Sequence, residues 1–172
     1  METPEYQMTE QTGFKKRSGD GGVFLVVADE TEEFSVALRY AARMAQSCRG
    51  HVAILHVMGL QDFQHWGNVE HRMRMELREQ AEKLVWNIAK NINDINGLIP
   101  SLYLEEGDVH NVVVDVINRD SEIKMLILAG TTGNSGPGPL ASYFTGKGLG
   151  KLRVPLAIVP SHLEPQVIDT VT

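Results

Sequence analysis

Short apolar runs alternate with segments of helical periodicity along most of this chain. The runs are residues 23–28, 51–58, 102–105, 125–129 and 154–159. Most are rich in Val, Ile and Leu, while the segments between them repeat apolar residues every three or four positions, as amphipathic helices do. Strands that alternate with helices pair in parallel through right-handed crossovers. The sequence therefore predicts an α/β fold, a three-layer α/β/α sandwich around a five-stranded, mainly parallel sheet.

The predicted helices have recognisable starts and stops. The first has an apolar stripe that begins at Phe34 and a stop signal at Gly50. A long second helix is predicted over residues 69–96, and Asp108 is expected to cap a third. The segment 140–152 contains three glycines, which leaves its helicity open.

Two side-chain roles follow from the first predicted helix. Cys48 closes the apolar stripe, so we interpret it as a small core residue and not as a reactive thiol. Arg39 and Arg43 fall on the opposite, polar face and are expected to point outward.

Prolines mark two of the predicted strands as edge strands. Pro100 precedes the run 102–105, and Pro155 lies near the start of the run 154–159. Proline has no N–H to donate to a neighbouring strand, so it is tolerated at the edge of a sheet and not in its centre.

Charge and composition narrow the class of protein. The 172 residues carry a formal net charge of -6, and no basic stripe offsets the repulsion of a polyanion, so nucleic acid is not expected as a partner. One cysteine, no apolar run of about 20 residues and no apolar signal core near the N-terminus predict a cytoplasmic protein without a membrane span. The length fits one domain, residues 22–161, between a flexible N-terminal tail, 1–21, and a C-terminal tail, 162–172, that packs locally or onto a partner.

The histidines and carboxylates of the sequence do not predict a catalytic site or a metal site. His56 lies inside a predicted strand, where a packed, hydrogen-bonded imidazole is the simplest interpretation. His65 and His71 are six residues apart, which is not the i, i+4 spacing of a helical metal pair. No Ser-His-Asp set or paired carboxylates occur at a convincing spacing, so an enzymatic activity is not favoured.

The fourth predicted strand leads into a glycine-rich loop. Seven of the sixteen glycines lie between Gly130 and Gly150. The sequence Gly130-Thr-Thr-Gly133 exposes backbone N–H groups at the carboxyl end of a parallel strand, where doubly wound sheets hold phosphates. A phosphate site and a simple set of turns both remain open. A Walker loop is excluded, because Ala141 and Gly148 occupy positions that its motif reserves for glycine and a hydroxyl.

Several motifs in this order resemble the universal stress protein family. They are the strand at 23–29, Ser35-Val-Ala-Leu38, the strand end at 55–57, the turn Glu106-Gly107-Asp108, the strand 126–130 and the closing segment 154–160. The segment 136–140, Gly-Pro-Gly-Pro-Leu, is similar to the alphaproteobacterial kind. The resemblance implies a bacterial, Rossmann-like protein with strand order 3-2-1-4-5. It also implies a homodimer that pairs through the last strand, Val154 to Val159.

One branch of that family binds ATP or AMP, with Mg²⁺ needed only for ATP. Its signature is Gly-x2-Gly-x9-Gly-Ser/Thr. In one register Gly130 and Gly133 fit its first two glycines, and in a second register Gly133 begins the motif and Gly146 ends it. Both registers place Lys147 where the family has a hydroxyl, and a third alignment places Ser142 there.

The resemblance implies a binding site on one rim of the sheet. Asp29 would contact the ribose or the adenine edge, and Val57 the adenine. The full set of implied binding residues is Ala28, Asp29, Val57, Gly130, Gly133, Ser142, Gly146 and Lys147.

Three functions remain in competition at this point. The first is a stress-response homodimer that binds an adenine nucleotide. The second is a nucleotide-free dimeric scaffold, favoured by the stiffness that Pro137 and Pro139 give the loop. The third is a slow ATPase, for which Asp29 is the only rim carboxylate that the sequence places.

Overall fold

The computed structural model describes residues 20–28, 31, 33–59, 70–97, 99–133 and 136–172. The predictions for Asp29 and His65 lie outside these residues, and so does most of the predicted N-terminal tail.

The five strands form one parallel sheet in the order β3-β2-β1-β4-β5. The strands are β1 (Val23–Ala28), β2 (His51–Met58), β3 (Ser101–Glu106), β4 (Ile123–Gly130) and β5 (Leu156–Pro160). β1 lies in the centre, where Val23 is in register with both His51 of β2 and Ile123 of β4. The predicted fold class and strand order are confirmed, and β3 and β5 are the two edge strands.

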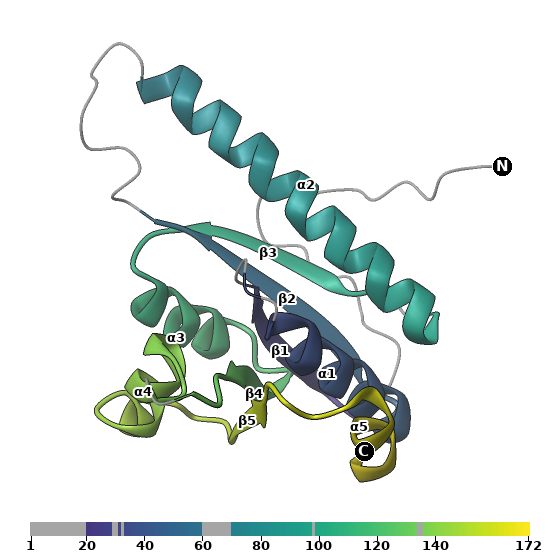
Figure 1. The fold of residues 1–172 in the computed structure, drawn as a ribbon. Coiled ribbons are helices and arrows are strands. Elements are labelled where there is room, and N and C mark those ends of the chain that lie inside the picture. The colour runs from purple at the N-terminus through teal and green to yellow at the C-terminus, as the bar shows by residue number, and fades with distance from the viewer. Residues whose placement is uncertain (1–19, 29–30, 32, 60–69, 98, 134–135) are drawn as a thin grey trace, which may run out of the picture.

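Helices cover both faces of this sheet (Figure 1). The helices α1 (Phe34–Cys48) and α2 (Glu70–Asn96) pack on one face, and α3 (Val109–Arg119) and α4 (Pro139–Thr145) pack on the other. This arrangement follows from right-handed crossovers, since the chain moves outward from β1 to β3 and then returns across the sheet to β4 and β5.

Two apolar cores lie between the sheet and these helix layers. Phe24, Ile54 and Ile92 belong to the core under α1 and α2, whereas Leu25, Ile117 and Phe144 belong to the core under α3 and α4. Successive residues of β1 point into opposite cores, which is why this strand is a continuous apolar run and does not alternate with polar residues.

One expectation for α1 is wrong. Cys48 is exposed, because the buried stripe ends at Ala45 and Arg49 then closes the helix in a left-handed conformation (φ 54°). Arg39 and Arg43 lie on the outer, polar face of α1, as expected, and both bind Asp169 there. That aspartate lies in α5 (Pro165–Val171), a short helix that packs against α1.

Candidate functional site

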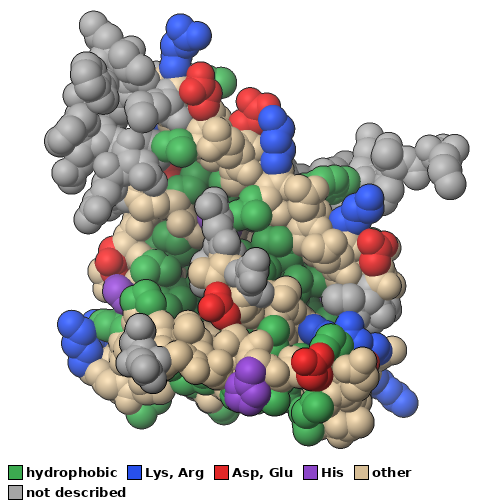
Figure 2. Space-filling model, in the orientation of Figure 1, with side chains coloured by type: hydrophobic (Ala, Val, Ile, Leu, Met, Phe, Trp, Pro, Cys, Tyr) green, Lys and Arg blue, Asp and Glu red, His purple; other side chains and the backbone are tan. Residues whose placement is uncertain are grey.

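A pocket of about 440 Å³ lies at the carboxyl ends of β1 and β2. α2 borders it on one side, and the first residues of α3 and α4 border it on the other. The space-filling view in the same orientation shows hydrophobic side chains gathered on this face, between α2 at the top and the α4 end at the lower left (Figure 2). The lining residues are Val27, Ala28, His56, Val57, Met58, Gly59, Leu77, Gln80, Ala81, Leu84, Val109, His110, Pro139 and Leu140.

The strand ends form the floor of this pocket. Ala28 of β1 is paired with His56 of β2, and Val57 follows it on the rim. The Nδ1 atom of His56 lies 3.4 Å from the carbonyl oxygen of Ala28, so the imidazole is packed against its neighbouring strand, as the sequence predicts. Parallel strands end at the same edge of the sheet, which brings these residues together although they are far apart in the chain.

One face of α2 supplies the second wall. Leu77, Gln80, Ala81 and Leu84 recur at i, i+3, i+4 and i+7, the spacing that places residues on one side of a helix. Ala81 is buried, whereas Leu77 and Leu84 are half-buried and border the pocket. This wall is apolar apart from the amide of Gln80.

The turn between β3 and α3 sets the third wall. Gly107 has a positive φ of 144°, and its N–H donates to the carbonyl oxygen of Met58 at 3.0 Å. Asp108 then caps α3 by accepting a hydrogen bond from the backbone N–H of Asn111 at 3.0 Å, as the sequence predicts. That bond, with the nearby His110, holds the pKa of the Asp108 carboxyl below its usual range. The turn thereby anchors α3 to the end of β2 and places His110 on the pocket wall.

Aromatic stacking fixes the ring of His110. Its centroid lies 4.0 Å from that of Tyr143, with a tilt of 39° between the two planes. Tyr143 in turn meets Phe144 edge to face, at 5.0 Å and 88°, and Phe144 is fully buried. The imidazole therefore rests on an aromatic stack that continues into the core.

The start of α4 completes the pocket. Gly136 and Gly138 have φ values of 82° and 90°, a region that side chains disfavour, and this path lets the chain turn from β4 into Pro139. Pro139 and Leu140 line the pocket. The Gly-Pro-Gly-Pro-Leu segment thus forms an apolar wall.

Comparisons with known proteins identify the architecture. No protein-family model matches the sequence, and no curated protein matches it. Among solved structures, the universal stress protein UspA from Lactobacillus plantarum is 17% identical with a TM-score of 0.62, over 80% of this chain and 97% of the other. A universal stress protein family member from Burkholderia pseudomallei is 16% identical with a TM-score of 0.62, over 83% and 98%. This chain has the universal stress protein fold.

A third structure with this fold is a complex with a ligand. It is a universal stress protein in complex with cAMP, 11% identical with a TM-score of 0.53, and the similarity covers 81% of this chain and 97% of that one.

Two of the binding residues implied by the resemblance meet in the pocket of this universal stress protein fold. Ala28 and Val57 both line it. Gly130, Gly133, Ser142, Gly146 and Lys147 are not among its lining residues, and Asp29 lies outside the described part of the chain.

Gly130 has a packing role in this fold. It is buried at the end of β4, and a Cβ atom added there would lie 2.6 Å from the Cγ2 atom of Ile158 in β5. Its carbonyl oxygen accepts the N–H of Ser161 at 2.9 Å. Gly133, by contrast, is exposed, with no atom within 4 Å of an added Cβ.

The residues around the end of α4 also lie apart from the lining residues. Ser142 is an exposed residue of α4, and Gly146 is exposed where that helix ends. The Nζ atom of Lys147 lies 5.4 Å from the centroid of the Tyr143 ring, and Lys151 Nζ donates to the Tyr143 hydroxyl at 3.0 Å. Both lysines therefore face Tyr143.

Sequence reasoning missed His110, Gln80, Pro139 and Leu140 as pocket residues. One signal for His110 was available, because a helix capped by Asp108 directly after a strand must begin on the same rim as the ends of β1 and β2. The stack that holds the ring gives no such signal, since Tyr143 is distant in the sequence.

The described part of the site carries little chemistry beyond binding. Among the lining residues that the structure describes, His56 and His110 are the two with a titratable side chain, and none is Lys, Arg, Asp or Glu. Within the described residues no group of three or more His, Cys, Asp or Glu could hold a metal ion. No helix in that part of the chain is long and apolar enough to span a bilayer. The arrangement favours binding of a partly apolar small molecule.

Proposed function

We propose that this chain is a cytoplasmic, homodimeric universal stress protein that binds an adenine nucleotide in the pocket at the ends of β1 and β2. The observation that carries the proposal is the position of that pocket. It lies at the carboxyl ends of strands beside the point where the strand order reverses, which is where doubly wound sheets hold their ligands. Its volume of about 440 Å³ lies in the usual range for small-molecule sites.

The walls of the pocket offer both apolar surfaces and hydrogen-bonding groups to a nucleotide base. Apolar side chains from β2 and α2, including Val57, Leu77 and Leu84, supply two surfaces between which a planar base can be buried. Gln80 and the two histidines supply hydrogen-bonding groups that can orient it. The cAMP complex of a universal stress protein supports this ligand class.

The side chains that line the pocket favour a nucleotide with one phosphate over a triphosphate. A triphosphate is normally held by lysine or arginine together with Mg²⁺ on carboxylates, and no such side chain is among the described lining residues. We therefore expect AMP or cAMP to bind more tightly than ATP, with Mg²⁺ involved only where ATP binds.

The proposal predicts that Val57→Trp abolishes nucleotide binding, because the indole fills the pocket. Binding is measured by calorimetry on dialysed protein with AMP, cAMP and ATP. Val167→Trp is the matched control, since Val167 is 43% exposed on α5 and does not line the pocket. We expect binding by the native chain and by the control, and at least a hundredfold loss in the Val57 variant, on the order of 3 kcal/mol.

Absence of binding at millimolar ligand would refute the proposed function. Binding that survives unchanged in a folded Val57→Trp variant would place the ligand elsewhere. Mass spectrometry of small molecules released when the purified protein is denatured provides an independent check.

A Gly130 variant does not test phosphate binding. Any side chain at Gly130 meets Ile158, so loss of binding would follow from a disturbed contact between β4 and β5. Gly133→Ala is the informative change, because an added methyl group there meets nothing within 4 Å. Unchanged affinity in that variant would remove Gly133 from the list of ligand contacts.

The proposed dimer pairs through β5, which is an edge strand of the described sheet. An open edge presents backbone groups to a second chain. Light scattering on the purified protein should give twice the mass of the chain, and a monomeric mass at micromolar concentration would exclude this part of the proposal.

A nucleotide-free scaffold is the second candidate. It is favoured by the apolar wall that Pro139 and Leu140 form where this fold could otherwise place a phosphate-binding loop. A protein that is dimeric, releases no small molecule on denaturation and binds none of the three nucleotides would support this function over the first.

A further inference from the structure

His110 is a titratable residue of the pocket wall that is held in place from two sides. The cap of α3 and the stack on Tyr143 hold its backbone and its ring from two sides. Its Nδ1 atom also lies 3.5 Å from the Oδ2 atom of Asp108, and the side chain keeps 31% of its exposure. A ring fixed in this way is preorganised to bind a ligand at low entropic cost.

The pocket needs a cation for an anionic ligand, and the lysines nearby do not line it. Lys147 and Lys151 both lie within 6 Å of the Tyr143 ring centroid, at 5.4 and 5.7 Å. The hydrogen bond to the Tyr143 hydroxyl raises the pKa of Lys151, which keeps that lysine charged in its present place. Among the described lining residues, positive charge can therefore come only from an imidazole.

We propose that His110, when protonated, contacts the phosphate of a bound nucleotide and gives the pocket its preference for phosphorylated over neutral nucleosides. This inference rests on the proposed function and adds to it the residue that distinguishes a charged ligand from a neutral one. An imidazolium that donates to a phosphate oxygen forms a charge-assisted hydrogen bond, about twice as strong as a neutral one.

The described charged groups around His110 have both signs. Asp108 at the start of its own helix is an acid, and Lys147 and Lys151, which follow α4 in the chain and lie near Tyr143, are bases. His56 on β2 is the other titratable residue of the described lining, and the ion pair of Arg74 with Glu106 lies at the end of β3. The proposal predicts that the affinity for an anionic ligand follows the protonation of His110 and rises as the pH falls.

The test compares cAMP with adenosine by calorimetry at about pH 5.5 and about pH 8, on either side of the ordinary histidine pKa. The phosphodiester of cAMP keeps one negative charge over this range, and adenosine is neutral, so a difference between the two reports on the protein. We expect cAMP to bind about tenfold more tightly at the lower pH and adenosine to bind equally at both.

Three variants assign the effect. In His110→Gln the affinity for cAMP should become independent of pH while adenosine binding is retained, because glutamine keeps a hydrogen-bonding group without the charge. His162→Gln is the matched control, since His162 is exposed and does not line the pocket, and it should behave as the native chain. A pH effect that survives in His110→Gln and disappears in His56→Gln would overturn the assignment.

A measurement on the native chain covers the case in which His110→Gln does not fold. The imidazole of His110 is titrated by NMR without ligand, with adenosine and with cAMP. Contact with the phosphate predicts that cAMP alone raises the pKa of His110, by about one unit for a tenfold effect on binding. An unchanged pKa with bound cAMP would refute the inference and leave the proposed function standing, whereas failure of both ligands to bind at either pH would refute the two together.

Discussion

Gly148 supports the wall of the pocket indirectly, through its packing against Tyr143. It is buried, and a Cβ atom placed on it would lie 2.3 Å from the Cε1 atom of Tyr143. Its N–H donates to the Tyr143 carbonyl oxygen at 2.9 Å. Because Gly148 has no side chain, the Tyr143 ring can pack against its backbone, and that ring stacks on His110.

Gly148→Ala is expected to destabilise the protein by about 1–3 kcal/mol, because the added methyl group overlaps the Tyr143 ring. The backbone itself allows alanine, since φ is -86° at this position. Urea unfolding measures the change. Gly150→Ala is the control, with no atom within 4 Å of an added Cβ, and its effect should stay within about 0.5 kcal/mol. Equal effects in the two variants would contradict this packing role.

The individual residues of the site were only partly predictable from sequence. Ala28 and Val57 could be named because the family resemblance implies a site on the rim that the ends of parallel strands share. The glycine loop was harder, since Gly130 packs on Ile158 and the positive φ of Gly136 and Gly138 turns the chain toward α4. Such roles depend on contacts between distant segments, which no local pattern encodes.

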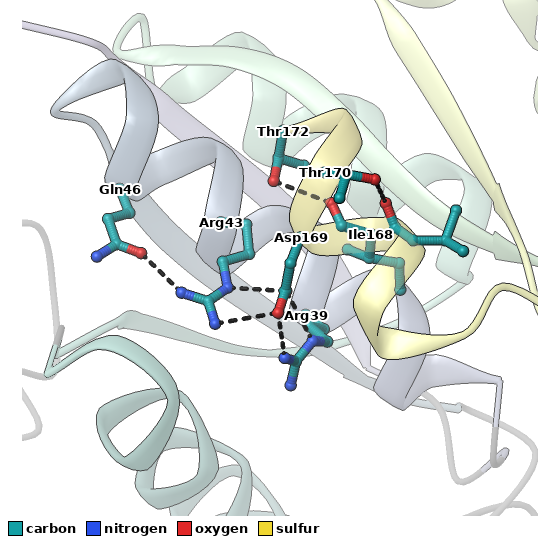
Figure 3. A network of polar contacts seen from close by, with 8 residues as sticks. Arg39, Arg43, Gln46, Ile168, Asp169, Thr170 and Thr172 are labelled. Atoms are coloured by element: carbon teal, nitrogen blue, oxygen red, sulfur yellow. Dashed lines mark hydrogen bonds and ion pairs between the residues drawn. The ribbon is translucent and has the colours of Figure 1, made fainter.

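At the scale of elements, α5 is held against α1 by one carboxylate. Arg39 binds Asp169 through two hydrogen bonds, Nε to Oδ1 at 3.0 Å and Nη2 to Oδ2 at 2.7 Å, and the Nε atom of Arg43 binds the same Oδ1 at 2.9 Å (Figure 3). Ile168 beside it is fully buried. The short helix therefore depends on one buried side chain and on this shared ion pair.

Asp169→Asn is expected to loosen α5 while the rest of the fold stays intact, because it removes the charge that two arginines share. Hydrogen exchange of the amides in α5 should become several-fold faster, with little change in β1 and β4. Asp115→Asn, at an exposed position of α3, should leave exchange in α5 unaltered. Equal exchange in the native chain and the Asp169 variant would show that Ile168 alone holds the helix.

The same contact predicts a pH dependence at acid pH. The hydrogen bond from Arg39, with that from Arg43, lowers the pKa of Asp169 below its ordinary value of 3.8. A carboxyl whose pKa is lowered by folding stabilises the folded state above the unfolded pKa, and that contribution is lost as the pH falls through the folded pKa. The carboxyl resonance of Asp169, followed by NMR, should titrate below 3.8, and Arg39→Met should move it upward. Titration at or above 3.8 in the native chain would contradict the contact.

Sequence periodicity predicted the large elements and missed the small one. Long apolar stripes predict the helices α1, α2 and α3, and the bounds of these helices lie within a few residues of those expected. α5 has seven residues and a single buried one, too few to give a period. Cys48 was misjudged for a related reason, because an apolar stripe does not show at which residue burial ends, here Ala45.

At the scale of the whole molecule, the sheet separates two cores that should contribute independently. Ile92 lies in the core under α1 and α2, and Ile117 lies in the core under α3 and α4. Each is almost completely buried. This layered order was the most predictable property of the chain, because alternating strands and helices with right-handed crossovers allow few other arrangements.

Ile92→Val and Ile117→Val are each expected to cost about 0.5–1.5 kcal/mol. The double variant should lose the sum within about 0.5 kcal/mol, since the two side chains belong to different core clusters on opposite faces of the sheet. Urea unfolding should remain a single transition in all three variants. Two separate transitions, or a strongly non-additive double variant, would show that the layers do not behave as two cores of one cooperative unit.

The central place of β1 has a consequence for how the protein reaches its fold. Val23 pairs with His51 on one side and with Ile123 on the other, and the second partner lies one hundred residues along the chain. During synthesis β1 and β2 can pair early, but the other edge of β1 stays open until β4 has been made. An open edge of a fully apolar strand invites wrong pairing with other chains. The strand that organises the finished sheet is therefore also the segment of the nascent chain most in need of protection.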